Sequence, residues 1–242
     1  MEIIETLING LSSGGTYAMI ALGYTMVYGI AKMLNFAHGD IIMVGGYMIF
    51  VTMAVTGSPT IGIIAAILFC VLLGMTIEKV AYKPLRGASP LAVLITAIGV
   101  SYLLQSTAQM IFGSAPKMVI IADLGNITVG SLKIPVYTVI TLICSFAVMI
   151  ALNLFVKYTK VGRAMIAVSE DRGAAQLMGI NVNGIIMITF AIGSALAALA
   201  GFFMLMKSPS LSNTLGAMPG IKAFTAAVIG GIGSIPGAMA GG

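Results

Sequence analysis

Five long stretches without a charged side chain constrain this fold more than any other feature of the sequence. They are residues 6–31, 41–77, 91–112, 135–156 and 185–206. An apolar run of about 18 or more residues can cross the hydrocarbon core of a bilayer as a helix. Charged residues make up 8% of the chain, against about a quarter in a soluble domain. The sequence therefore predicts an integral membrane protein and excludes a soluble domain.

A turn divides the longest stretch, and proline interrupts the last apolar segment. Thr56-Gly57-Ser58-Pro59-Thr60 predicts a tight turn. Residues 219–242 contain seven glycines and two prolines, and Pro236 beside glycines predicts a broken or re-entrant segment. The predicted fold class is an all-α, polytopic transmembrane helix bundle in one domain, 1–242. It has about seven segments: 6–31, 38–55, 60–77, 91–112, 135–156, 185–206 and the broken 219–242.

The distribution of lysine and arginine predicts the orientation, because cytoplasmic loops are enriched in these residues. The chain opens with Glu2 and Glu5 rather than with the basic start of a cleaved signal, so the first segment is expected to be retained. An outside N-terminus leaves Lys117, Lys133 and Lys207 outside, with Lys222 uncounted. It places eight basic residues inside: Lys32, Lys79, Lys83, Arg86, Lys157, Lys160, Arg163 and Arg172. The loop 113–134 is then periplasmic and the loop 157–184 cytoplasmic. The net charge of +5 reflects orientation and implies no nucleic-acid partner.

Two further expectations concern the loops and the metal chemistry. In the outer loop, the β-prone runs 118–121 and 127–129 flank Asp123-Leu124-Gly125-Asn126 and predict a small hairpin. Cys70 and Cys144 lie within apolar segments, where a cysteine usually acts as a small hydrophobic residue. With these two and one histidine, no metal site and no cofactor is expected.

The connection between the first two helices contains polar groups that support two interpretations. Asn35, His38 and Asp40 fall in Leu34-Asn35-Phe36-Ala37-His38-Gly39-Asp40. Asn35 could cap the free N–H groups of the second helix, and Asp40 would favour the positive end of its dipole. Alternatively, polar groups at membrane depth line a path or lock a gate. The other candidates for a translocation pathway or gate, chosen for their depth or for the broken backbone, are Tyr17, Tyr24, Gln105, Gly233 and Pro236.

The inner loop contains a predicted short amphipathic helix within residues 168–180. Ala174, Leu177 and Met178 share a face at i, i+3, i+4 spacing. The apolar face would be buried in lipid headgroups or in a partner protein. Glu170, Asp171 and Arg172 are expected to begin this helix, and Gly179 to end it.

Small residues recur every four positions on two segments. Gly193, Ala197 and Gly201 do so on the sixth predicted helix, and Gly233, Gly237 and Gly241 near the end of the chain. This spacing permits close helix packing, which is the interpretation we prefer.

Several of these motifs together resemble one known family. Met26-Val27-Tyr28-Gly29, the run from Leu34 to Asp40, Leu177-Met178-Gly179-Ile180-Asn181, Pro219-Gly220-Ile221-Lys222-Ala223-Phe224 and Gly230-Gly231-Ile232-Gly233-Ser234-Ile235-Pro236-Gly237-Ala238 are similar to the LivH-type permease of bacterial branched-chain amino-acid ABC importers. The resemblance extends over essentially the whole chain. Members of that family continue with at least one more helix, so the sequence is expected to lack the family's C-terminal end.

The resemblance implies a non-enzymatic transport subunit in the bacterial inner membrane. Its partners would be a second related permease, two cytoplasmic ATP-binding subunits and a periplasmic amino-acid-binding protein. Loop 157–184 would correspond to the coupling loop of ABC permeases, with Glu170, Asp171, Ala174, Ala175, Leu177, Met178 and Gly179 as candidate ATPase-coupling residues. The general consensus there is Glu-Ala-Ala, three residues and Gly. Ala174-Ala175 and Gly179 match it, whereas Gly173 stands in place of Glu.

Three alternatives remain open at this point. A permease of the same family could import urea or short amides. A passive channel of the aquaporin kind would need a pair of Asn-Pro-Ala loops, which the sequence lacks. A purely structural membrane scaffold would not explain the polar inner loop and the broken last segment.

Overall fold

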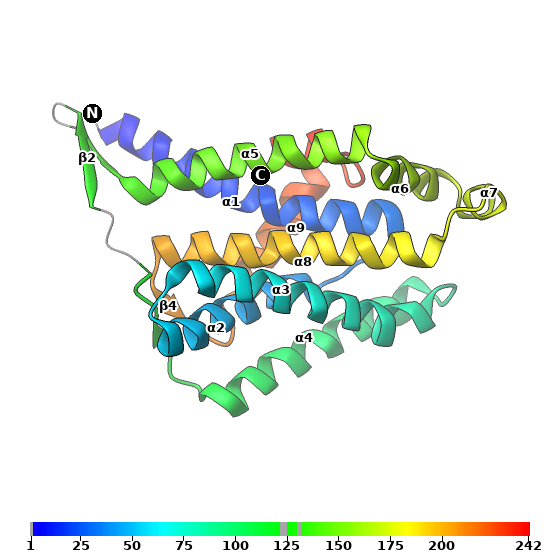
Figure 1. Ribbon diagram of the computed structural model, residues 1–242, viewed down its shortest axis with the longest axis horizontal. Coiled ribbons are helices and arrows are strands. Elements are labelled where there is room, and N and C mark those ends of the chain that lie inside the picture. The colour runs from blue at the N-terminus through cyan, green and yellow to red at the C-terminus, as the bar shows by residue number, and fades with distance from the viewer. Residues whose placement is uncertain (1, 122–124, 130–131) are drawn as a thin grey trace.

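The structure is a computed structural model that describes residues 2–121, 125–129 and 132–242. Figure 1 shows long helices running roughly along one axis, with strands at one end and two short helices at the other. The helices are α1 (Glu2–Ala31), α2 (His38–Thr56), α3 (Pro59–Ile77), α4 (Pro90–Phe112), α5 (Val136–Tyr158), α6 (Lys160–Glu170), α7 (Arg172–Leu177), α8 (Val182–Lys207), α9 (Ala217–Gly230) and α10 (Ile235–Gly241). Four short strands are β1 (Lys117–Met118), β2 (Asn126–Val129), β3 (Leu132–Pro135) and β4 (Ser210–Leu211). The predicted all-α class is confirmed.

Within the described residues, five helical stretches are long and apolar enough to cross a membrane. They are His38–Thr56, Pro59–Leu85, Pro90–Phe112, Val136–Tyr158 and Val182–Lys207. The second of them continues α3 through a π-helix, η1 (Glu78–Tyr82), and a 3₁₀ turn, η2 (Lys83–Leu85). Of the other two predicted segments, α1 has 30 residues but is less apolar, and α9 has 14 residues.

The turn before α3 has the predicted structure. Gly57 ends α2 in the left-handed region, with φ +66°, and its N–H donates to the carbonyl of Met53. Pro59 occupies the first turn of α3, where its missing N–H would have no helical partner anyway.

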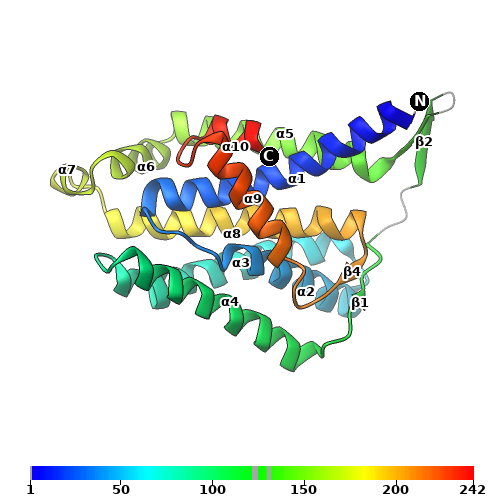
Figure 2. The same cartoon turned by 180° about the vertical axis from the view of Figure 1, so that it is seen from behind.

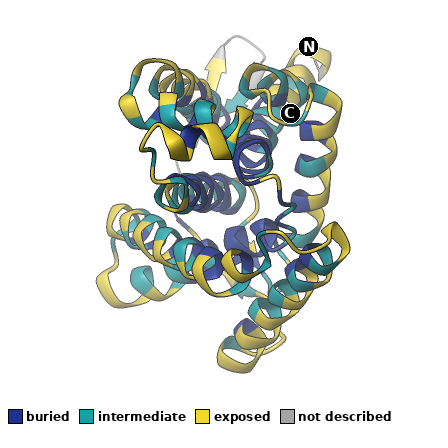
Figure 3. Ribbon diagram, turned by 90° about the vertical axis from the view of Figure 1, so that its right-hand side faces the viewer, coloured by how far each residue is buried: buried dark blue, intermediate teal, exposed yellow. Residues whose placement is uncertain are grey.

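Helix α8 forms the centre of the bundle and packs against α1, α2 and α3. Figure 3 shows the buried residues gathered in the middle and the exposed ones on the outer faces. The prediction that small residues on α8 permit close packing is confirmed, because a Cβ on Gly201 would lie 2.7 Å from the Ile42 carbonyl oxygen of α2. The outer faces carry exposed apolar side chains such as Leu68, Leu103 and Ile143, as expected of surfaces that meet lipid or another subunit.

The outer loop folds differently from the predicted hairpin. β1 pairs with β4 rather than with the run 127–129, and β2 pairs with β3 in an antiparallel hairpin. The prediction considered residues 113–134 alone, whereas the partner of β1 comes from the far end of α8. Asp123 and Leu124, which were expected to form the turn, lie outside the described residues.

The last apolar segment is broken, as predicted. α9 ends at Gly230, a turn with φ +95° at Gly231 and +97° at Gly233 follows, and α10 then packs back on α9 and α1. A Cβ on Gly237 would lie 1.9 Å from the carbonyl oxygen of Gly230, so the two helices cross where only glycine fits. The break precedes Pro236, which lies in the first turn of α10 and begins a helix rather than interrupting one.

Candidate functional site

The connection between α1 and α2 runs back into the bundle. Figure 2 shows residues 32–37 leaving the end of α1 and meeting the start of α2 well inside the helical layer. Lys32 ends α1 in the left-handed region, with φ 51°, and its N–H donates to the Tyr28 carbonyl at 2.8 Å. The connection and the first turn of α2 therefore bring Asn35, His38 and Asp40 to buried positions between helices.

Asn35 is held by the end of α3 and does not cap α2. The hydroxyl of Tyr82 donates to Asn35 Oδ1 at 2.9 Å, and both residues are buried. The N-cap position of α2 is Ala37, which makes no side-chain capping bond. The capping interpretation of Asn35 is therefore wrong, because its amide oxygen is already used across the bundle.

His38 and Tyr24 form an aromatic pair in the same region. Their ring centroids lie 4.7 Å apart with an interplanar angle of 64°, and the ring centroid of Phe224 on α9 lies 5.8 Å from that of Tyr24. His38 is 1% exposed, and its Nε2 has no hydrogen-bond partner among the residues that the structure describes.

Asp40 is also paired within the membrane-spanning region. Gln105 of α4 donates from Nε2 to Asp40 Oδ1 at 2.8 Å, and the same nitrogen lies 3.3 Å from the Ser101 hydroxyl. Asp40 does lie in the first turn of α2, as predicted. A carboxyl group that is 2% exposed at this depth requires such a partner, which explains why α4 is polar at Ser101 and Gln105.

The other predicted pathway residues lie apart from these. Tyr17 is half-buried on α1 and lies under Lys222, whose Nζ is 5.9 Å from the ring centroid. Gly233 contacts Gly29 of α1, but Gly233 and Pro236 are both exposed. The bundle of this chain therefore encloses neither of these two predicted pathway residues, whereas Ala238 of α10 is buried.

Sequence reasoning missed Tyr82, which holds Asn35. The charge-free stretch ends at Ile77, so the predicted helix 60–77 stops before Tyr82. The signal available was that Tyr82 follows α3 without a helix breaker until Pro84, so the helix could continue.

The inner loop contains two short helices where one was predicted. Glu170 is the last residue of α6, and Asp171 separates α6 from α7 with its backbone extended. Asp171 Oδ1 accepts from the N–H groups of Gly173 and Ala174 at 2.7 and 3.0 Å and so caps α7. The prediction that Glu170 begins the helix is wrong, while Gly179 ends it with φ +81° as expected.

One face of α7 is anchored and the other is exposed. Ala175 is 4% exposed and belongs to the core. Leu177 and Met178, two residues of the predicted apolar face, are 90% and 82% exposed. No other part of the described chain packs over them. Ala174 is exposed as well. The loop thus presents a small apolar surface, which we call the α7 surface and define as Ala174, Leu177 and Met178.

Two arginines join the loops at this end to the helix bundle through contacts that the sequence did not predict, although Arg172 does begin α7 as expected. Arg86 forms an ion pair with the buried Glu78 of η1 and donates to Asn183 at the start of α8. Arg172 donates from Nη2 to the carbonyl of Ala31 and, at 3.3 Å, to that of Ile30. Burial and the nearby Arg86 charge lower the pKa of the Arg172 guanidinium from its ordinary value.

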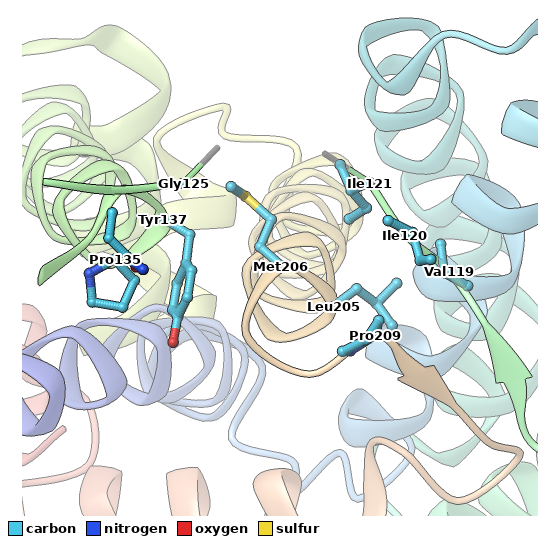
Figure 4. Close-up of a pocket in the computed structure, with 10 residues that line it drawn as sticks. Val119, Ile120, Ile121, Gly125, Pro135, Tyr137, Leu205, Met206 and Pro209 are labelled. Atoms are coloured by element: carbon cyan, nitrogen blue, oxygen red, sulfur yellow. The ribbon is translucent and has the colours of Figure 1, made fainter. Parts of the chain in front are cut away.

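Cavities occur at both ends of the bundle, away from the polar residues at its centre. One, of about 360 Å³, lies beside the end of α8 that leads into β4 and is lined by residues including Ile121, Tyr137 and Met206 (Figure 4). Two others, of about 230 and 260 Å³, share Arg172 in their lining. The space beside Tyr24 and Asn35 has no room for a water molecule.

Comparisons with known proteins identify the family of this chain. Residues 6–242 match the family described as "Branched-chain amino acid transport system / permease component". The chain is 43% identical to the high-affinity branched-chain amino acid transport system permease protein BraD of Pseudomonas aeruginosa, over 99% of this chain and 82% of that protein. It is 42% identical to the permease protein LivH of Escherichia coli K12, over 100% and 83% of the two chains. A probable LivH of Methanocaldococcus jannaschii is 28% identical over 93% and 73%.

No solved structure matches this chain. The family match extends over nearly all of the sequence, and two curated relatives exceed 40% identity over more than four fifths of their own length. This chain belongs to the family of permease components of branched-chain amino acid transport systems.

Proposed function

We propose that this chain is the membrane-spanning permease subunit of an ATP-driven importer of branched-chain amino acids. The observation that carries the proposal is the 42–43% identity to BraD and LivH over essentially the whole chain. The names of these relatives favour amino acids over urea or short amides, and a permease over a passive channel.

The subunit would hydrolyse no ATP itself. Two cytoplasmic ATP-binding subunits would supply the energy, a second related permease would complete the pathway, and a periplasmic binding protein would deliver the amino acid. The exposed α7 surface supports docking of an ATPase subunit, because apolar side chains such as Leu177 gain free energy when a partner covers them. The N-terminus would be outside, with loop 113–134 in the periplasm and loop 157–184 in the cytoplasm.

The translocation step would use the polar residues at the start of α2. Tyr24, Asn35, His38, Asp40 and Gln105 lie on four different segments, so a rigid-body shift of one helix against another would break and remake their contacts. The space beside Tyr24 and Asn35 is closed in this structure. The conformation described would thus be one in which this region is shut.

A charged substitution on the α7 surface tests whether an ATPase subunit docks there. In the full-length parent protein, Leu177→Asp should reduce the amount of ATPase that co-purifies, because an unpaired charge in an apolar contact costs several kcal/mol. Val55→Asp is the matched control. Val55 is an apolar residue at the other end of the bundle, and its exposed fraction of 82% is close to the 90% of Leu177. Equal co-purification of the ATPase with both variants would remove α7 from the interface.

Substrate uptake tests the function itself. Proteoliposomes that contain the complete importer and its binding protein should accumulate labelled leucine, isoleucine or valine when ATP is enclosed with the ATPase subunits. Accumulation of urea or acetamide without uptake of these amino acids would assign the complex to the rival substrate class. Uptake without ATP would favour a channel.

A further inference from the structure

We infer that Arg172 is the positioning residue through which movement of α7 reaches the unwound segment 32–37. The inference rests on the proposed function, because it concerns how a docked ATPase would act on the pathway. It begins with the backbone at the end of α1.

The last carbonyl groups of α1 have no helical partners of their own. A helix leaves its final four carbonyls without an N–H from the next turn. The Lys32 N–H satisfies the Tyr28 carbonyl at 2.8 Å. Ile30 and Ala31 are 7% and 1% exposed, so water has little access to their carbonyls, and an unpaired buried carbonyl is costly.

Arg172 satisfies both of these carbonyls from another part of the chain. Its Nη2 donates to the carbonyls of Ile30 and Ala31, more than 140 residues earlier in the sequence. A guanidinium at a helix C-terminus is also favoured by the helix dipole. The end of α1 is therefore complete only while the first residue of α7 stays in place.

Two cavities adjoin the Arg172 side chain. Arg172 lines one cavity, of about 230 Å³, together with Lys32, Met33 and Leu34, and it lines another, of about 260 Å³, together with Val182 and Asn183. Among the described elements, α7 packs against α6 and the start of α8, and Arg172 donates the hydrogen bonds that join α7 to the end of α1. A displacement of α7 would thus change the two hydrogen bonds that Arg172 donates to the end of α1, and the adjoining cavities leave space for it.

The polar residues around the start of α2 follow closely in sequence after the two carbonyls that Arg172 binds. Lys32 is the next residue after Ala31 and is held in a left-handed conformation that costs about 1–2 kcal/mol for a residue other than glycine. Three residues later, Asn35 accepts from Tyr82. Withdrawal of Arg172 would release the end of α1, and the strained Lys32 could then relax and move Asn35.

The experiment compares Arg172→Gln with Arg163→Gln in the complete importer, which contains the full-length parent protein. Arg163 is exposed on α6 in the same loop, so this control removes the same charge from the same side. Three quantities are measured: hydrogen exchange of the amides of residues 28–36, the amount of co-purifying ATPase, and the amino acid accumulated per ATP hydrolysed.

Arg172→Gln should speed exchange at 28–36 about tenfold, the effect of losing a hydrogen bond from a charged donor. Uptake per ATP should fall about fivefold or more, the lower end of ordinary coupling energies, while the ATPase still co-purifies. Arg172→Lys, which keeps the positive charge and one donor nitrogen, should restore part of the uptake. Arg163→Gln should change none of these quantities.

Unchanged hydrogen exchange at residues 28–36 would show that Arg172 does not stabilise the end of α1. Faster exchange with normal uptake per ATP would show that this contact does not transmit movement of α7 to segment 32–37. Loss of the ATPase from the Arg172→Gln complex would place Arg172 in the docking surface and also overturn the inference. These results differ from a failure of the proposed function, in which the wild-type complex itself would accumulate no branched-chain amino acid.

Discussion

The hydroxyl of Tyr82 donates to Asn35 Oδ1 at 2.9 Å, so the π-helical end of α3 holds the unwound segment between α1 and α2. Tyr82→Phe should lower the free energy of unfolding by about 1–3 kcal/mol, because the buried amide oxygen of Asn35 loses its partner. Thermal unfolding in detergent measures this loss. Tyr158→Phe is the control, since Tyr158 is 65% exposed, and equal unfolding midpoints for both variants would show that the bond contributes nothing.

The pair of Asp40 and Gln105 should behave as a unit. Gln105→Leu leaves the buried carboxyl of Asp40 without its 2.8 Å donor and should cost about 1–3 kcal/mol in the same unfolding measurement. Replacing both residues by leucine should restore part of the stability, because the buried carboxyl that lost its donor is then absent. Gln109→Leu, one turn further along α4 in an exposed contact with Asn213, should have little effect. A double variant no more stable than the single one would contradict this pairing.

Two glycine substitutions should have opposite effects. Gly74→Ala on α3 should destabilise the protein by about 1–3 kcal/mol, because its Cβ would lie 1.9 Å from Ser194 Oγ and 3.1 Å from the Phe190 carbonyl oxygen of α8. Gly99→Ala on α4 meets no atom within 4 Å and should stabilise its helix by up to about 1 kcal/mol. Unfolding midpoints that shift in the same direction would refute the close contact between α3 and α8.

The excess of basic residues in alternate loops predicts the orientation in the membrane. In a variant with Cys70 and Cys144 replaced by alanine, Asn126→Cys should react with an impermeant thiol reagent in intact cells. Lys160→Cys should react only after the cells are opened. Both positions are exposed, so access across the membrane decides the result. The opposite pattern would place the N-terminus inside.

Most of the helices could be predicted from local sequence, because each depends on its own composition. The uncharged stretches located α2, α4 and α5 to within a few residues, and Gly57 with Pro59 located the turn before α3. Hydrophobic length and backbone conformation are properties of a segment by itself. For the same reason the break before α10 and the exposed Leu177 were predictable.

The partners across the bundle depended on tertiary structure. Asn35 was interpreted as a cap, but its amide oxygen accepts from Tyr82, 47 residues away. β1 pairs with β4 from the end of α8, and Arg172 completes the end of α1. Each of these contacts joins segments whose distance is set only when the helices pack. The sequence by itself determined that the chain spans a membrane and where its polar groups lie along each helix. Packing decided which of those groups meet, because a buried polar atom takes whichever partner the assembled helices bring within hydrogen-bonding distance.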